Sequence, residues 1–196
     1  ETEIMYRQTD IWKIFRYNAF TLSQKNMWNY GGTPFSNNAS LRWQSMTMNR
    51  YEWDVKETFA WNWLDSRLLR GGPDVRFGSY FLTSAKFNTD KAKRMMFMLK
   101  YEGDHNFEGN RFNTISPSLT FRLGNHVYLS GQLDYAWNTD EMQYVATTSP
   151  LSSSSLAPYY YVMGHMDQKT YGLTLKLQVN VTPDISIQFY LSLIHI

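Results

Sequence analysis

The sequence predicts an all-β protein made of long antiparallel strands, and three observations lead to this class. Apolar and polar residues alternate along most of the chain, as they do in a strand with one apolar and one polar face. No segment has a helical period, and no apolar run approaches the ~20 residues that a membrane helix needs. Aromatic residues make up 17% of the 196 residues, a high share for an ordinary soluble domain.

The clearest alternation runs from Tyr171 to Ser192 and is almost unbroken. Odd-numbered positions from Tyr171 to Val181 are apolar, whereas the even-numbered positions between them are polar or glycine. This stretch matches the ~9–11 residues of a tilted membrane strand and exceeds the ~5–6 residues of an average soluble strand. The question is therefore whether the apolar face points into a core or into lipid.

The same pattern predicts about nine strands and no domain linker. The predicted strands span residues 12–28, 38–48, 52–63, 76–87, 93–103, 111–123, 126–145, 159–182 and 185–196. Glu57 is the one residue that breaks the alternation in the third of these segments.

The connections between these strands fall into two classes that alternate along the chain. Short turns are expected at residues 49–51, 88–91, 124–126 and 182–184. Longer loops rich in Gly, Pro and Ser are expected at residues 30–37, 64–74, 102–110 and 147–158. Up-and-down outer-membrane barrels show this asymmetry, with tight turns at one end and long loops at the other.

Strand register supports hairpins at the two clearest turns. A three-residue turn at 124–126 places Leu123 opposite Val127, and one at 182–184 places Val181 opposite Ile185. Apolar residues then face apolar residues across each hairpin, as cross-strand pairing requires.

A soluble β-sandwich, whose apolar faces form a core, shows the same alternation and is the alternative. Strand length, a charged polar face and aromatic residues at the expected strand ends favour a membrane barrel instead. The aromatic residues in question are Trp61, Trp63 and Tyr159 to Tyr161. We therefore predict an antiparallel, up-and-down transmembrane β-barrel with lipid at its apolar face and a hydrated lumen at its polar face.

Composition and motifs exclude several functions. The net charge of +2 gives no large electrostatic footprint for nucleic acid, and the absence of cysteine excludes disulfides and thiolate metal sites. No known catalytic motif is present, and the serine run from Ser152 to Ser155 has the composition of a loop. The four histidines, His105, His126, His165 and His195, have no ligand spacing. We predict no catalytic residue, no metal and no cofactor.

Two groups of charged residues are candidates for binding. The loop at 64–74 carries the first group, Asp65, Arg67, Arg70 and Asp74. A solvated ion-pair network that shapes an external loop is the favoured interpretation, and a loop folded inward to constrict a pore or bind a ligand is the alternative. The second group lies on the polar face and comprises Arg122, Asp134 and Lys176. These residues either tune the selectivity of a pore or form internal salt bridges.

Three segments carry a resemblance to a known family. They are WNYGG (Trp28 to Gly32), RGGP (Arg70 to Pro73) and the terminal stretch from Met166 to Tyr190. They resemble an uncharacterised family with a C-terminal outer-membrane β-barrel of unknown function. Many members also carry an N-terminal carbohydrate-binding module of the family-nine type and are labelled hydrolases for that reason.

The resemblance implies a place in the outer membrane of a Gram-negative bacterium, with membrane lipid as the partner. The binding module is missing here, so polysaccharide binding cannot be assigned to any residue of this chain. The family's barrel is larger, and about nine strands is an odd count, so residues 1–196 are expected to be an incomplete, C-terminal part of one barrel domain. Residues 192–196 end in Leu193 to Ile196, which breaks the alternation and suggests a non-native end.

These observations lead to one functional hypothesis with two alternatives. The chain is predicted to act as the anchor or pore of an envelope protein that handles polysaccharide. The first alternative is an outer-membrane hydrolase whose active site lies at the loop rim. Its acidic and histidine candidates are Asp65, Asp74, Asp104, His105, Glu108, Asp140 and Glu141. The second alternative is a soluble lectin-like β-sandwich.

Overall fold

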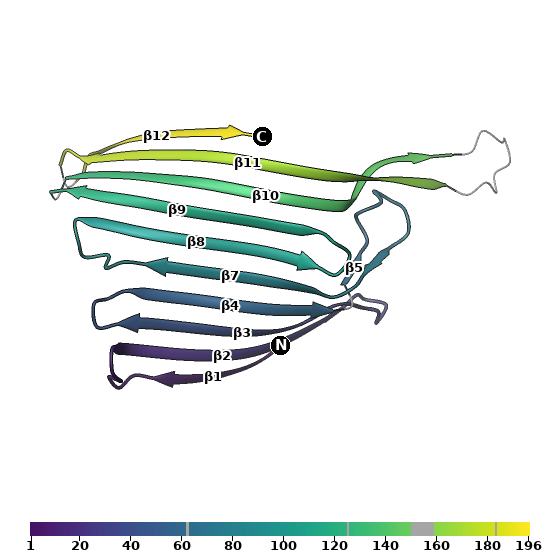
Figure 1. Cartoon of the computed structure of the whole chain (residues 1–196), viewed down its shortest axis with the longest axis horizontal. Helices are drawn as coiled ribbons and strands as arrows, with labels where there is room; N and C mark the ends of the chain where they lie inside the picture. Colours follow the sequence, from purple (N-terminus) through teal and green to yellow (C-terminus); the bar gives the residue numbers. More distant parts are fainter. Residues whose placement is uncertain (62, 125, 150–158, 183) are drawn as a thin grey trace.

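A computed structural model describes residues 1–61, 63–124, 126–149, 159–182 and 184–196 of the chain. It shows one large antiparallel sheet in which ten strands follow one another in sequence order (Figure 1). The strands are β1 (Thr2–Gln8), β2 (Phe15–Trp28), β3 (Pro34–Thr47), β4 (Glu52–Trp61), β7 (Tyr80–Asn88), β8 (Met95–Asn106), β9 (Arg111–Leu123), β10 (Val127–Thr148), β11 (Tyr160–Asn180) and β12 (Ser186–His195). The connection from β4 to β7 contains a second, two-stranded sheet of β5 (Trp63–Asp65) and β6 (Val75–Phe77).

The predicted all-β, antiparallel, up-and-down arrangement is confirmed, but the strand count of about nine is wrong. The missed strand of the main sheet is β1, which pairs Ile4 with Leu22 and Tyr6 with Phe20. The inference of an incomplete barrel from an odd strand number therefore no longer applies. Over the described residues, no helix is long and apolar enough to cross a membrane.

The sheet is open. Strands β1 and β12 lie at opposite edges and do not pair with each other, so the described residues do not close into the predicted barrel (Figure 1). Each edge strand consequently presents one row of backbone groups with no partner in this sheet.

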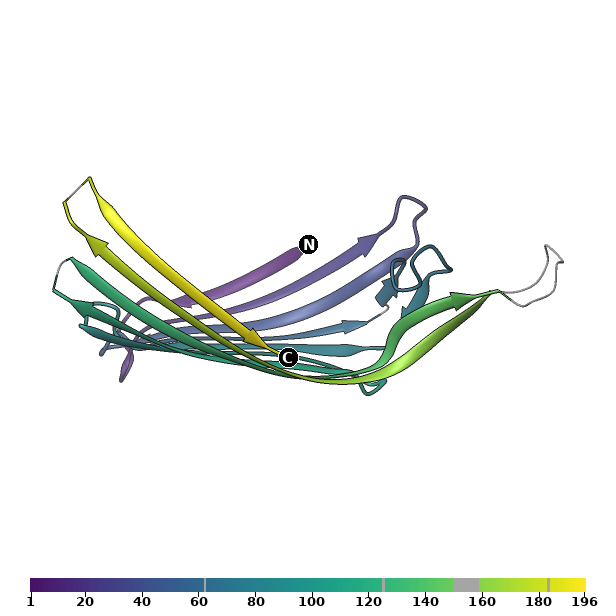
Figure 2. The same ribbon diagram turned by 90° about the horizontal axis from the view of Figure 1, so that it is seen from above.

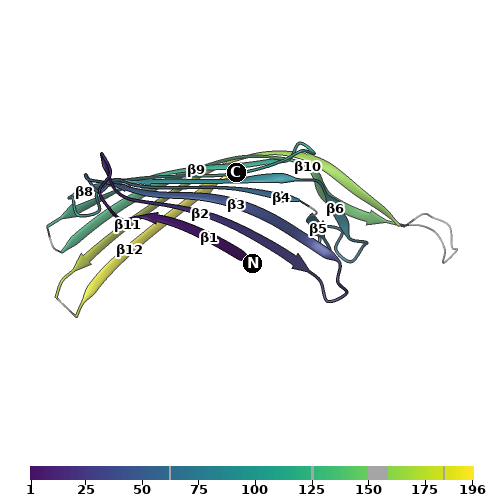
Figure 3. The ribbon, with the colours of Figure 1, turned by 90° about the horizontal axis from the view of Figure 1, so that it is seen from below.

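Curvature distinguishes the two faces of the sheet, which bends into a trough with the β5–β6 hairpin on its concave side (Figures 2 and 3). Trp63 and Phe77 of the hairpin line a cavity together with Tyr80 and Leu82 of β7. Along β7 and β8 successive side chains alternate between the apolar and the polar face of the sheet, and Leu82 and its register partner Asp104 lie on the polar face. The polar face is therefore the concave face, and the apolar face is convex.

The convex face is apolar and uncovered. Register aligns Phe20 with Trp43, and Trp43 with Val55, across three strands, and aligns Leu175 with Leu191 near the opposite edge. Many large apolar side chains on this face are exposed: Phe20 45%, Leu22 53%, Leu41 55%, Leu129 41%, Leu133 56%, Leu177 36% and Ile187 62%. Among the described residues no sheet packs against the convex face, so this face is not part of a sandwich core.

The carboxylate that interrupts the apolar pattern of β4 has a local partner. Glu57 lies opposite Leu41 on one side and Thr83 on the other, and its Oε2 accepts a hydrogen bond from the Thr83 hydroxyl at 2.7 Å. The misplaced carboxylate identified in the sequence therefore has a polar partner on its own face.

The connections lie at two ends, here called the tight-turn end (after β1, β3, β7, β9 and β11) and the long-loop end (after β2, β4, β8 and β10) from the lengths predicted for them (Figure 1). The predicted difference in length holds only in part, because connections 9–14 and 89–94 at the first end are longer than 29–33 and 107–110 at the second. Both predicted hairpin registers are confirmed by the pairs Leu123–Val127 and Gln178–Gln188. Two predicted long loops are shorter than expected, because β3 begins at Pro34 and β8 continues to Asn106. Much of the predicted loop 147–158, with Ser152 to Ser155, lies outside the described residues.

The chain end that the sequence analysis suggested to be non-native continues β12 as far as His195. Leu193 pairs with Leu173, Ile194 with Gly172 and His195 with Tyr171. Because the register is unchanged, Ile194 falls on the concave polar face, where it meets a glycine rather than another large side chain.

Candidate functional site

The concave face carries a network of polar side chains that is the first candidate site. On β3 and β4, Arg42 forms an ion pair with Asp54, whose carboxylate also accepts a 3.2 Å hydrogen bond from the Gln44 amide. Ser23 and Ser40 share a 2.7 Å hydrogen bond between β2 and β3. Register places Gln44 opposite Asp54 and Ser23 opposite Ser40, and Arg42 lies two residues from Gln44 on the same face of β3.

The predicted lumen charges lie on this face but are not brought together. Asp134 accepts hydrogen bonds from Ser116 at 2.6 Å and from Gln132 at 2.8 Å. Arg122 lies over the ring of Tyr128 at 5.8 Å from its centroid, and Lys176 lies over Tyr190 at 5.4 Å. Within the described part of the chain none of the three charges has a salt bridge, so the expected internal pairing is replaced by hydrogen bonds and cation–π contacts.

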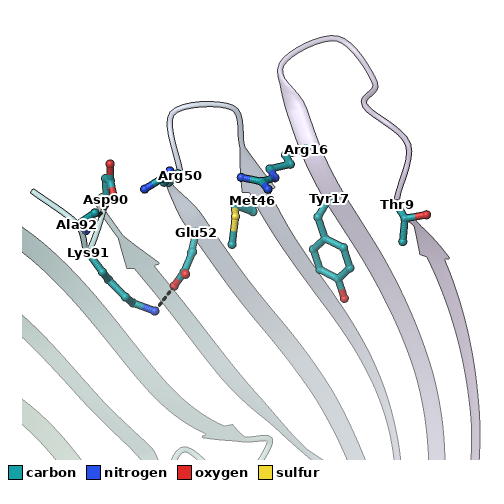
Figure 4. Close-up of a pocket in the computed structure, with 9 residues that line it drawn as sticks. All are labelled: Thr9, Arg16, Tyr17, Met46, Arg50, Glu52, Asp90, Lys91 and Ala92. Atoms are coloured by element: carbon teal, nitrogen blue, oxygen red, sulfur yellow. Dashed lines mark hydrogen bonds and ion pairs between the residues drawn. The ribbon is translucent and has the colours of Figure 1, made fainter.

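A hollow of about 560 Å³ opens at the tight-turn end of the concave face (Figure 4). Three basic residues line it, Arg16, Arg50 and Lys91, against two acidic ones, Glu52 and Asp90. Lys91 is paired with Glu52 (Figure 4). Sequence reasoning missed this group because its members come from three separate turns that are distant in the sequence.

The loop that contains RGGP is built by local hydrogen bonds rather than by ion pairs. Asp65 Oδ1 accepts hydrogen bonds from the backbone N–H groups of Arg67 (2.7 Å) and Leu68 (3.0 Å). No ion pair links Asp65, Arg67, Arg70 and Asp74 in the described structure, so the favoured interpretation of this loop is wrong. Its hairpin lies over the concave face, and the alternative role of the loop, in constricting a pore or binding a ligand, stays a prediction.

The RGGP loop contacts an arm formed by residues 140–148 of β10 and 160–166 of β11. This arm extends beyond β9, whose pairing with β10 ends at Arg111 and Thr139 (Figures 1 and 2). The Arg70 guanidinium lies 5.2 Å from the ring centroid of Tyr144. Gly72 lies so close to Tyr161 that a Cβ atom built on it would be 2.6 Å from Cε1 of that ring.

The turn between β8 and β9 links the same elements. Glu108 accepts a 2.6 Å hydrogen bond from the backbone N–H of Gly78, which follows β6. On its other side, the Asn110 side-chain oxygen accepts a 2.7 Å hydrogen bond from the backbone N–H of Glu141 in the arm. Loop, turn and arm therefore form one connected rim at the long-loop end.

The rim residues proposed for a hydrolase do not converge. Asp65 accepts backbone hydrogen bonds in its own loop, Glu108 accepts one from Gly78 after β6, and Asp140 accepts one from the N–H of Met142 at 2.9 Å. His105 turns to the convex face, where Nε2 lies 2.8 Å from Asn113 Oδ1. Asp104 lines the cavity under the hairpin.

One acid–histidine group forms where the arm begins. His165 Nδ1 lies 3.0 Å from Glu141 Oε2, and Nε2 lies 3.0 Å from Asp167 Oδ2. These hydrogen bonds, from Asp167 first and Glu141 second, raise the pKa of His165, and the bond to His165 lowers the pKa of Asp167. Sequence reasoning named Glu141 and His165 separately but missed Asp167, because β-bulges in the arm change which residues meet.

The described residues hold no cluster of three or more His, Cys, Asp or Glu side chains suited to a metal ion. No family model, curated protein or solved structure matches this chain.

Proposed function

We propose that this chain forms part of the wall of an outer-membrane β-barrel and serves as an anchor or a pore. The convex face would contact the hydrocarbon of the bilayer, and the concave face would line a water-filled interior. In this arrangement the sheet hydrogen bonds satisfy backbone groups that lipid cannot satisfy.

The uncovered apolar convex face is the observation that carries the proposal. Leu175 and Leu177 remain 37% and 36% exposed although β11 is paired on both sides, and a soluble fold would cover them. Polar residues meanwhile gather on the concave side, where Ser116 and Gln132 both donate hydrogen bonds to Asp134. A soluble protein with one bare apolar face would aggregate, whereas a bilayer provides the missing partner.

Aromatic side chains at the long-loop end support the same placement. Phe59, Phe81 and Phe107 form a chain of ring contacts with centroids 5.1 Å and 6.0 Å apart, and Phe59 also stacks on Trp61 at 5.7 Å. Rings placed near strand ends are typical of the aromatic girdle of membrane barrels. Trp63 does not belong to this girdle, because it lies in the hairpin on the concave side.

The open edges set a condition on the proposal. In a bilayer the unpaired groups of β1 and β12 need partners, supplied by further strands beside each edge or by each other in a closed barrel. The family that the sequence resembles has a larger barrel, which would supply such strands. The same resemblance implies a Gram-negative outer membrane and a parent protein that handles polysaccharide through a separate module.

Site-specific labelling of the full chain tests the proposal, and the lack of native cysteine makes single-cysteine variants simple to interpret. Nitroxide labels would be placed at 173, 175 and 177 on the convex face and at 174, 176 and 178 on the concave face, with the chain reconstituted in phospholipid vesicles. We expect high accessibility to oxygen at the odd positions and to a water-soluble nickel chelate at the even positions. Equal accessibility at both sets, or a chain that stays monomeric in buffer without detergent, would contradict the proposal.

A further inference from the structure

A cavity of about 370 Å³ lies between the β5–β6 hairpin and the concave face, within the usual size range of small-molecule sites. Its walls come from the hairpin, from β7, β8 and β9, and from the turn after β8. The lining residues are Trp63, Phe77, Tyr80, Leu82, Asp104, Asn106, Asn110 and Phe112.

The hairpin brings two aromatic residues over this cavity. Trp63 and Phe77 are register partners in the two-stranded sheet, so their side chains lie on the same face of it. Trp63 meets Tyr80 edge to face, with ring centroids 5.8 Å apart and planes at 89°. Two perpendicular rings in contact form a corner, and Phe112 on β9 adds a further ring to the lining.

One carboxylate lies among these rings. Asp104 pairs in register with Leu82 and Phe112, which places it on the main-sheet side of the cavity. It is half-buried, and within the described ranges its carboxylate has neither a hydrogen bond nor an ion pair. Among the residues that the structure describes, none of those lining the cavity is basic, and the neighbouring His105 is bonded to Asn113 on the convex face.

Two amide side chains, those of Asn106 and Asn110, also line the cavity, and neither carries a charge. Asn106 Oδ1 accepts a 2.8 Å hydrogen bond from the Asn110 N–H, and Asn110 Oδ1 accepts one of 2.7 Å from the Glu141 N–H. Both amide oxygens are thus used within the protein. The cavity therefore presents aromatic faces and one unneutralised negative charge.

We infer that this cavity binds an organic cation, specifically a small alkylammonium or quaternary ammonium group. The negative faces of aromatic rings attract such cations, and tryptophan does so most strongly. A carboxylate among the rings supplies the opposite charge, which counts for more in a partly desolvated site than in water. A neutral sugar fits less well, because Asp104 would stay unneutralised and the perpendicular rings offer no single flat platform.

The inference stands on the hairpin geometry and does not depend on a membrane location. Its test is calorimetric titration of the full chain, in detergent micelles, with choline and with 3,3-dimethyl-1-butanol. These two alcohols have nearly the same shape and differ in that a carbon replaces the charged nitrogen. We expect choline to bind at least about tenfold more tightly than the neutral alcohol.

Variants assign the binding to the cavity. Asp104→Asn keeps the shape of the side chain but removes its charge, and Trp63→Leu removes one ring; each should weaken choline binding by about tenfold. Glu102→Gln is the matched control, because Glu102 lies on the same strand and face but does not line this cavity and is paired with Lys100. Its choline affinity should stay within about twofold of the parent.

Several results would overturn the inference. They are equal binding of choline and its neutral isostere by the unmodified chain, no choline binding at millimolar concentration, unchanged choline affinity in Asp104→Asn, or a neutral disaccharide that binds where choline does not. The isostere comparison uses the unmodified chain, so it decides the matter even where a variant fails to fold.

Discussion

The guanidinium of Arg70 lies over the ring of Tyr144, 5.2 Å from its centroid, and joins the RGGP loop to the arm of β10 and β11. Arg70 adopts a left-handed backbone conformation, with φ of 48°, in the turn that directs its side chain to this ring. The contact connects two segments that the sequence separates widely, so it helps to fix the hairpin over the concave face.

Replacing Arg70 with alanine should loosen the loop and the arm together. An exposed cation–π contact is worth about 0.5–1 kcal/mol, so amide hydrogen exchange in both segments should accelerate by about two- to fivefold. Hydrogen exchange read by mass spectrometry on peptides from both segments measures this. Arg67→Ala is the control, because the hydrogen bonds of Arg67 in this loop use its backbone N–H and carbonyl groups. Equal acceleration in the two variants would contradict a specific role for the ring contact.

Gly72 should be intolerant of a side chain for a different reason from its neighbour Gly71. A Cβ atom on Gly72 would meet Tyr161, whereas Gly71 has open space around it but a φ of 104°. Gly72→Ala should therefore couple energetically to Tyr161→Ala, and Gly71→Ala should not. Double-mutant cycles on the free energy of unfolding in urea, with the chain in detergent micelles, measure both couplings. A coupling free energy of zero between Gly72→Ala and Tyr161→Ala would contradict this prediction, because it would show that the Tyr161 ring moves away at no energetic cost.

The fold was most predictable where alternation was continuous and turns were short. The registers of β9–β10 and β11–β12 followed from the sequence because a one-residue slip would turn every apolar side chain to the wrong face. Residues 102–106 were predicted as loop from their Gly, Asp, His and Asn content, yet β8 continues through them. Pairing with β7 and β9 overrides local preference there, and a Cβ on Gly103 would lie 3.0 Å from Cζ of Tyr101, whose ring covers this glycine.

The candidate sites were less predictable, because they depend on contacts between distant segments. The side of the sheet on which the RGGP loop lies is set by contacts such as that of Trp63 with Tyr80, and a sequence pattern does not show it. The alternation of odd and even positions correctly placed Arg122, Asp134 and Lys176 on one face. It did not predict that each of them contacts a partner of its own. The β-bulges in the arm interrupt the alternation of faces, so the sequence pattern did not predict the group around His165.

Arginine substitutions on opposite faces of β11 should differ in their effect on stability in a bilayer. Leu175 lies on the convex face opposite Leu191, and Thr174 lies on the concave face opposite Ser192. If the convex face contacts lipid, Leu175→Arg should destabilise the folded chain by about 2–4 kcal/mol, and Thr174→Arg by much less. Urea titration of the chain in phospholipid vesicles, followed by tryptophan fluorescence, gives both values. Equal destabilisation by the two substitutions would remove lipid as the partner of the convex face.

His165 should make the order of the arm depend on pH, because it bridges Glu141 and Asp167 where the arm leaves the main sheet. Its pKa is raised in the folded state, so its contribution is complete below the usual histidine value and is lost as pH rises through the raised value. The pKa of Asp167 is lowered, so its contribution is present above the usual aspartate value and is lost as pH falls through the lowered one. Once corrected for its intrinsic pH dependence, hydrogen exchange in the arm should be slowest between about pH 4 and 6.5 and should accelerate above that window. His165→Gln should abolish the dependence, while His126→Gln, at the tight-turn end, should leave it intact; a profile unchanged by His165→Gln would assign it to other groups.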